Sequence, residues 1–258
     1  MNPSRHAAPI YEWPPEDEAE GSTVQAHLET LLAGDALESL TMRLKIAEAG
    51  DLQPIVNVLA TAPRPGLRRL VLAEFGEALG DWFGNGEPYG YWSPLGDLSG
   101  LWAKLPALEE LVVQGRTMTL GNIVLPAAKR VAIRGVLSSE NLQAIAAAHW
   151  PEVERLEIFF GDPADGAEGS VEDIMPILAG QGLPKLRELG LVFCIFIDEV
   201  VKRLDQMTVL SQLTSLDLSL SDLSLEAQGI LYEQRHRLAH LRELKTHEAR
   251  IAEWICEQ

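Results

Sequence analysis

Two histidines, His236 and His240, stand four residues apart, a spacing that places both imidazoles on one face of a helix, where they could bind a metal ion. A third ligand is not evident in the sequence around them. The basic side chains of Arg235, Arg237 and Arg242 would also repel a cation. The sequence therefore predicts a helix end and a turn at this point, and no metal site.

A cysteine nucleophile or a phosphate-binding loop would be the next candidates for chemistry. Cys194 follows an apolar stretch and is expected to be a small buried residue rather than a nucleophile. The sequence contains no Gly-Lys-Ser or Gly-Lys-Thr phosphate loop, no His-Glu-x-x-His motif and no Gly-x-Ser-x-Gly motif. We therefore expect a protein that is not an enzyme and that has no cofactor.

A glycine-rich and aromatic loop near residues 82–92 is the one segment that keeps an enzymatic alternative open. Gly84, Gly86 and Gly90 only approximate a dinucleotide-binding fingerprint, because the third glycine comes one position late. A pocket lined by Trp82, Tyr91 and Trp92 together with convergent ionisable groups would favour the alternative.

The composition narrows the classes of partner. The chain has 258 residues, of which 47% are apolar, so it can form a sizeable core. Its 21 basic and 38 acidic residues give a net charge of −17, which makes nucleic acid an improbable partner. With no apolar run near the length of a membrane span and only two cysteines, the sequence favours a cytoplasmic protein that does not bind membranes.

The main signal in the chain is a repeat in which three apolar residues are separated by two residues and then by one. It occurs seven times, at residues 67–72, 108–113, 128–133, 153–158, 186–191, 213–218 and 241–246. In five copies a proline stands two positions before the first apolar residue, where a turn would lead into a strand. Apolar residues at helical spacing follow some copies, as in 171–178 and 197–204, so we expect strands that alternate with helices.

The repeats set the expected organisation of the chain. Residues 1–22, rich in proline and acid, predict a tail or an extended strap, in which Tyr11 and Trp13 could cover the open end of the repeats. Residues 23–50 predict an N-terminal cap. Within it, residues 36–50 fit a helix as well as a strand, and we favour a strand near 41–46. Residues 51–258 then form the repeat domain, which begins with a helix and carries insertions near 74–100 and 161–170.

Two of the copies resemble the unit of leucine-rich repeat proteins of the ribonuclease-inhibitor type. They are residues 186–201, with Cys194 at the ninth position, and residues 213–227, with Ser221 at that position. Residues 96–111, 156–161 and 216–219 look, more narrowly, like a group of bacterial repeat proteins, some of which are labelled molybdate-metabolism regulators. The resemblance implies an α/β right-handed solenoid, with a parallel concave sheet and helices on the convex side. It also implies a binding scaffold, and it brings no catalytic residue.

Because side chains alternate along a strand, inward apolar residues would leave the positions between them on an exposed face. The candidate partner-binding residues on this face are Arg69, Glu110, Arg130, Arg134, Arg155, Glu157, Phe159, Glu188, Asp217 and Glu243. Basic residues gather at the third and fourth copies and acidic ones dominate later, with Phe159 beside the boundary. Arginine and aromatic residues are enriched where binding energy concentrates.

The expected partner is therefore another protein. A narrower hypothesis is that the chain inhibits or neutralises a basic partner, as an immunity protein neutralises a toxin, because its net charge would attract such a partner. The alternative for the face is an ordinary solvated surface with the phenylalanines partly in the core.

Overall fold

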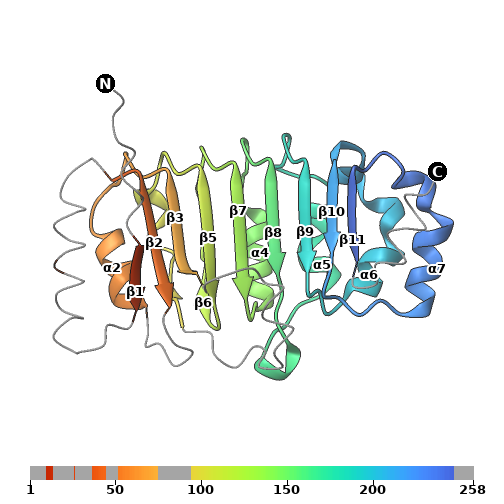
Figure 1. Ribbon diagram of the computed structural model, residues 1–258, viewed down its shortest axis with the longest axis horizontal. Helices are drawn as coiled ribbons and strands as arrows, with labels where there is room; N and C mark the ends of the chain where they lie inside the picture. The colour runs from red at the N-terminus through yellow and green to blue at the C-terminus, as the bar shows by residue number, and fades with distance from the viewer. Residues whose placement is uncertain (1–9, 14–25, 27–36, 45–51, 75–93, 247–258) are drawn as a thin grey trace.

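The computed structural model describes residues 10–13, 26, 37–44, 52–74 and 94–246. Within them nine strands form one large sheet, and every pair of neighbouring strands is parallel. The order of the strands across the sheet follows their order along the chain, as Figure 1 shows. Parallel neighbours need a connection that crosses back past the sheet, and here each connection returns the chain to the next position in the same sheet.

The strands of the large sheet are short and similar in length. They are β1 (Ile10–Trp13), β2 (Ser39–Leu44), β3 (Arg69–Glu74), β5 (Glu110–Gly115), β7 (Arg130–Gly135), β8 (Arg155–Phe159), β9 (Glu188–Val192), β10 (Ser215–Leu218) and β11 (Glu243–Thr246). A second, two-stranded parallel sheet pairs β4 (Gly96–Asp97) with β6 (Met118–Thr119). The strands at all seven predicted repeat positions are confirmed.

Helices and helical turns occupy the connections. The α-helices are α2 (Gln53–Ala60), α4 (Ser139–Ala147), α5 (Val171–Leu178), α6 (Ile197–Lys202) and α7 (Leu225–Glu233). The 3-10 turns are η1 (Trp102–Lys104), η2 (Pro163–Asp165), η3 (Leu204–Gln206), η4 (Thr208–Gln212) and η5 (Arg235–Arg237). Helices α4 to α7 each contact the next one along the chain, and α4 and α5 lie behind the sheet in Figure 1. Among the helices of the described residues, none has the length and apolar character to cross a bilayer.

The strands are aligned so that equivalent positions of successive copies are neighbours. Arg69, Glu110, Arg130, Arg155, Glu188, Ser215 and Glu243, the third residues of the seven copies, pair in a single row across the sheet. The apolar residues of the repeat lie in the continuous hydrophobic core, with at most 8% of each exposed. The last position of the seventh copy, Thr246, is half-buried.

Strand ends approach each other closely where β5, β7 and β8 finish. A Cβ atom at Gly135 would collide with the carbonyl oxygen of Gly115, and one at Gly161 would collide with that of Gly135. Gly161 also has a φ of +88°, which disfavours other residues. Glycine is therefore required where successive turns of the chain stack at this edge of the sheet.

The N-terminal part extends the same sheet. The strand expected near 41–46 is β2. It belongs to a further copy of the repeat beyond the seven predicted ones, with Leu37, Leu40 and Met42 as its apolar residues. The expected helix after it is α2, which buries Ile55. Within the segment expected to be a tail or strap, residues 10–13 form β1, paired with β2.

Of the two expected insertions, the described residues contain the one near 161–170. Residues 75–93, which make up most of the insertion near 74–100, lie outside the described residues, as do the side chains of Tyr11 and Trp13. The segment near 161–170 contains the turn η2, in which the Asp162 carboxylate accepts a hydrogen bond of 2.8 Å from the amide of Ala164.

Replacing one repeat leucine tests whether burial between stacked strands stabilises the fold. Leu216 on β10 is fully buried, and we expect Leu216→Ala to lower the free energy of unfolding by about 2–5 kcal/mol because it removes apolar contacts and leaves a cavity. Denaturant unfolding followed by circular dichroism measures the change. The matched control is Leu225→Ala on α7, where the leucine is 85% exposed, with an expected change below about 0.5 kcal/mol. Equal effects at the two positions would contradict the proposed role of the stacked core.

Candidate functional site on the sheet face

The outward side chains of β3, β5 and β7 to β11 form one surface, which we call the sheet face. It bears the third and fifth residues of each repeat copy and, on β7, Arg134 at the seventh position. Leu70 and Leu72 on β3 point into the core. Arg69 before Leu70 and Val71 between the two leucines therefore point the other way, as do the residues paired with them in the same rows. The candidate residues of the repeats are therefore brought together on one side of the sheet.

The first cluster of the face joins β2, β3, β5 and β7. The Glu110 carboxylate accepts hydrogen bonds from Arg69 Nε at 3.1 Å and from an amino group of Arg130 at 2.7 Å. Arg69 also donates to the Thr41 hydroxyl at 2.9 Å. Burial would raise the pKa of Glu110, but its bonds to Arg130 and Arg69 outweigh this and hold the pKa below its ordinary value.

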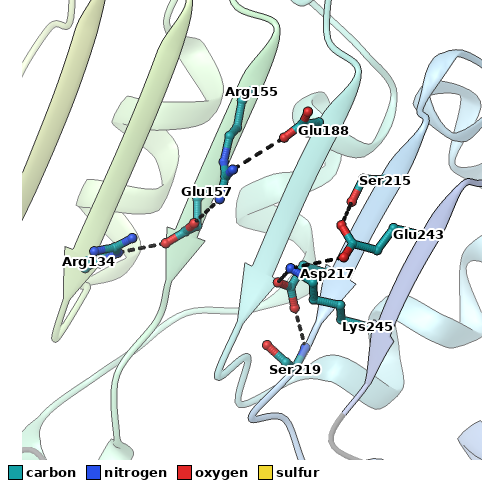
Figure 2. A network of polar contacts seen from close by, with 9 residues as sticks. All are labelled: Arg134, Arg155, Glu157, Glu188, Ser215, Asp217, Ser219, Glu243 and Lys245. Carbon is teal, nitrogen blue, oxygen red and sulfur yellow. Dashed lines mark hydrogen bonds and ion pairs between the residues drawn. The ribbon is translucent and has the colours of Figure 1, made fainter. Parts of the chain in front are cut away.

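The second cluster surrounds Glu157 on β8, as Figure 2 shows. Its carboxylate, only 9% exposed, accepts a hydrogen bond of 2.7 Å from Arg134 Nε and one of 3.1 Å from Arg155. Arg155 reaches in the other direction to Glu188, at 3.5 Å. Burial would raise the pKa of Glu157, yet Arg134 and Arg155 outweigh burial and lower the pKa, so the group is a carboxylate at neutral pH.

The third cluster lies on β10 and β11. The Lys245 ammonium is 3.6 Å from a carboxylate oxygen of Asp217 and 3.5 Å from one of Glu243 (Figure 2). The Ser215 hydroxyl donates to Glu243 at 3.2 Å, and the other oxygen of Asp217 accepts from the Ser219 amide at 2.9 Å. These side chains are also held by neighbours on their own face.

The charges of the sheet face cancel. Its acidic residues are Glu110, Glu157, Glu188, Asp217 and Glu243, and its basic residues are Arg69, Arg130, Arg134, Arg155 and Lys245. Each of them lies within 4 Å of an opposite charge on the face. The acidic excess of the chain therefore has its origin elsewhere than among these residues.

A shallow hollow of about 190 Å³ lies over β5, β7 and β8. Its charged lining consists of Arg130, Arg134, Arg155, Glu110 and Glu157. Val112 and Ala132, adjacent fifth positions of two copies, provide short apolar side chains at its base. We call this feature the arginine hollow.

Phe159 does not take the position expected of it. Its ring is fully buried and stacks on Phe193, with ring centroids 5.4 Å apart. Phe159 is not a member of the main hydrophobic core, and on β8 it is the neighbour of Arg134 on β7, a residue of the sheet face. The expectation that Phe159 offers its ring to a partner is corrected: no surface of this side chain is exposed.

Sequence reasoning left two contributors out of the candidate set. Lys245 holds the third cluster together, and Thr41 binds Arg69. A signal existed for both, because Lys245 is the fifth residue of the seventh copy and Thr41 is the fifth residue of the copy that begins at Leu37. Val112 and Ala132 at the base of the arginine hollow are also fifth residues of their copies, so the same rule places them on the sheet face.

The cysteine and the two histidines that the sequence offered for chemistry lie in the following environments. Cys194 is 2% exposed, and burial raises the pKa of its thiol to about 12, so the thiol is protonated at neutral pH. A ring nitrogen of His240 lies 2.9 Å from the carbonyl oxygen of Leu210, while His236 belongs to the turn η5. Among the described residues, no three or more His, Cys, Asp or Glu side chains form a group that could hold a metal ion. The aromatic loop near 82–92 lies outside these residues.

Comparison with known proteins adds information on the fold. The chain is similar to a crystal structure of a Bacteroides fragilis protein, with a TM-score of 0.71 and 20% sequence identity. The match covers 90% of this chain and 66% of that one, so this chain spans just under two thirds of the length of its structural relative. The chain matches no protein-family model and no curated protein. Together the sheet and the match define an α/β protein with a large parallel sheet.

The paired carboxylate of Glu157 gives the stability of the protein a pH dependence. Its pKa in the folded state is below the ordinary value of 4.5, so its stabilising effect is complete above that pH and is lost as the pH falls through the folded pKa. We expect Glu157→Gln to cost about 1–3 kcal/mol in free energy of unfolding at pH 7, and the difference from the wild type to shrink below pH 4.5.

Urea unfolding at a series of pH values measures this effect. The control is Glu188→Gln, which changes a carboxylate that is 48% exposed and should cost less than about 1 kcal/mol. A constant difference between the wild type and Glu157→Gln from pH 7 to pH 3 would show that the charge of Glu157 does not stabilise the fold.

Proposed function

We propose that this protein is a non-enzymatic, protein-binding scaffold of the leucine-rich repeat type, a curved right-handed solenoid that binds its partner on the sheet face. We place it in the bacterial cytoplasm. The observation that carries the proposal is the register of the strands, which sets the third residues of seven successive copies side by side on one exposed surface. A fixed row of mixed polar side chains is suited to recognise a complementary surface.

The size of the face favours a macromolecule over a small molecule. Seven strands at a spacing of about 4.8 Å make a row about 29 Å long. This length is comparable to the width of the patch that each partner buries in a standard protein interface, and it exceeds what one metabolite can contact. The loops at the strand ends would extend the same surface.

The repeat classification has support beyond the spacing of the leucines. Cys194 and Ser221 occupy the ninth positions of two successive copies, and the amide of Cys194 donates a hydrogen bond of 2.9 Å to the Ser221 hydroxyl. Both residues are buried. Equivalent positions of neighbouring copies therefore interact outside the strands as well, as the stacking of similar units requires.

The charge of the face bears on the kind of partner. Five acidic and five basic groups paired with one another favour a partner that also carries both signs, because charge complementarity sets specificity. The narrower hypothesis of a basic partner that is neutralised by this chain draws no support from the balanced face. It rests on the net charge of −17 alone.

A charge reversal on the face tests the proposal. Glu188 on β9 is 48% exposed, and we expect Glu188→Arg to weaken the binding of a protein partner by about tenfold or more, because it places a cation beside Arg155 and opposite the partner. The measurement compares proteins captured from a bacterial lysate by wild type and variant, followed by titration calorimetry with the captured partner.

The matched control is Glu199→Arg. Glu199 lies on α6, is 52% exposed, and forms an ion pair with Lys202 at 3.4 Å, so the same change is made in a similar setting away from the sheet face. We expect it to leave binding unchanged. A partner that binds Glu188→Arg as well as the wild type, or that loses affinity only with Glu199→Arg, would exclude the sheet face as the interface.

A further inference from the structure

The arginine hollow is the place on the sheet face where cations gather around an open space. Arg130 and Arg155 are paired neighbours on β7 and β8, Arg134 lies further along β7, and all three line the hollow. Their side chains are 58%, 23% and 51% exposed, so solvent and ligands can reach them. In the cluster on β10 and β11, by contrast, a single basic group, Lys245, lies between the carboxylates of Asp217 and Glu243.

The guanidinium groups are held in place by carboxylates that do not exhaust their donors. The nearly buried Glu157 binds Arg134 through its Nε and Arg155 through one amino group. Arg130 uses one amino group on Glu110. A guanidinium presents several N–H groups in a planar fork, so each of the three arginines keeps further donors for an anion in the hollow.

The space beneath Glu157 belongs to this arrangement. Gly190 on β9 is the residue next to Glu157 across the sheet, and a Cβ atom there would lie 3.1 Å from the Glu157 Cγ. Glycine at this position lets the carboxylate side chain lie low against the sheet, where it holds Arg134 and Arg155. The orientation of the two arginines is therefore fixed before any ligand arrives.

We infer that the arginine hollow binds a carboxylate side chain of the partner protein. The inference rests on the proposed function and names the chemistry of one contact within it. Three arginines and two glutamates give the lining a net charge of one positive unit, which a single carboxylate neutralises. The apolar side chains of Val112 and Ala132 suit the methylene groups that carry such a carboxylate.

The same charge count disfavours a phosphate. A phosphate group with two negative charges would leave the hollow with an excess of negative charge, in a chain whose net charge is −17. At physiological ionic strength charges are screened beyond about 8 Å, so the lining residues dominate the local potential. The electrostatic potential of the arginine hollow is therefore positive only at short range. It favours a single acidic side chain over a partner protein that is acidic as a whole.

Nuclear magnetic resonance on the full chain labelled with ¹⁵N-arginine tests the inference without a known partner. The probe is N-acetylglutamate N-methylamide, a model of a glutamate within a chain, and its glutamine analogue is the control. We expect the glutamate probe to shift the side-chain signals of Arg130, Arg134 and Arg155 saturably, with a dissociation constant on the order of millimolar. The signal of Arg116, which is 45% exposed and lies outside the hollow, should not shift.

Two variants with matched controls identify the site. Arg130→Gln should weaken probe binding about tenfold by removing one charge-assisted contact, while Arg116→Gln leaves it unchanged. Ala132→Leu should abolish probe binding by filling the hollow with all three arginines retained, while Ala147→Leu at the exposed end of α4 does not. If Ala132→Leu unfolds the protein, Arg130→Gln alone tests the inference. The Arg130 side chain is largely exposed, so its replacement should not disturb the fold.

Three results would overturn the inference: equal shifts with the glutamine analogue, shifts at Arg116 as large as those in the hollow, or tighter binding of inorganic phosphate than of the glutamate probe.

Failure of this inference can be distinguished from failure of the proposed function. A probe that does not bind, together with a partner lost in Glu188→Arg, would remove the carboxylate contact and leave the sheet face as the interface. A bound probe with a partner indifferent to Glu188→Arg would keep the carboxylate site and remove the partner from this face.

Discussion

The parallel strands of this protein are too short to bury their apolar side chains alone, and this constraint governs the rest of the structure. Each strand of the nine-stranded sheet has four to six residues, and its inward side chains become buried only when strands of the same register lie beside it. A slip by one residue would turn the leucines toward water and the charged residues toward the core. Hydrophobic burial therefore enforces the register, and the register determines which outward side chains meet.

The register of the core also determines how the charged residues of the sheet face are arranged. A side chain on one strand always lies beside the equivalent position of the next strand. One row therefore contains Arg130, Arg155 and Glu188, and the next row contains Ala132, Glu157 and Gly190. Opposite charges at adjacent positions stabilise such a sheet and like charges destabilise it. The single junction of like charges in the first row is Arg130 beside Arg155. At that junction Glu110, Glu157 and Glu188 bind the two arginines from either side and from the row below.

Much of this arrangement could be predicted from the sequence, because a repeat expresses the same physical requirement many times. The seven copies located the strands and identified nine of the ten candidate residues as members of one face, since alternation along a strand is a simple rule. Phe159 was the exception. It follows the alternation, and yet its ring is covered, which depends on Phe193 and on packing that no strand pattern encodes. The backbone of Phe193 has a φ of 50°, a conformation that its residue type would not predict.

Other features required the three-dimensional structure. Sequence spacing cannot show that Glu157 is nearly buried between two arginines, because its burial depends on Arg134 on β7, Arg155 on β8 and Gly190 on β9 together. The copy at Leu37 was overlooked for a different reason. Met42 replaces the final leucine there, and the neighbouring residues fit a helix as well as a strand.

A face of paired charges has a particular consequence for binding. Every ion pair that a partner covers must lose water, and the pairs within the face offset only part of that cost, so the face gains little affinity from charge alone. What such a face gains is discrimination, because a partner with the wrong sign at one position leaves a desolvated charge without a counterpart. The arginine hollow departs from this balance by a single charge and has apolar side chains at its base. It is therefore the position on the sheet face where a correctly placed acidic side chain would add affinity as well as specificity.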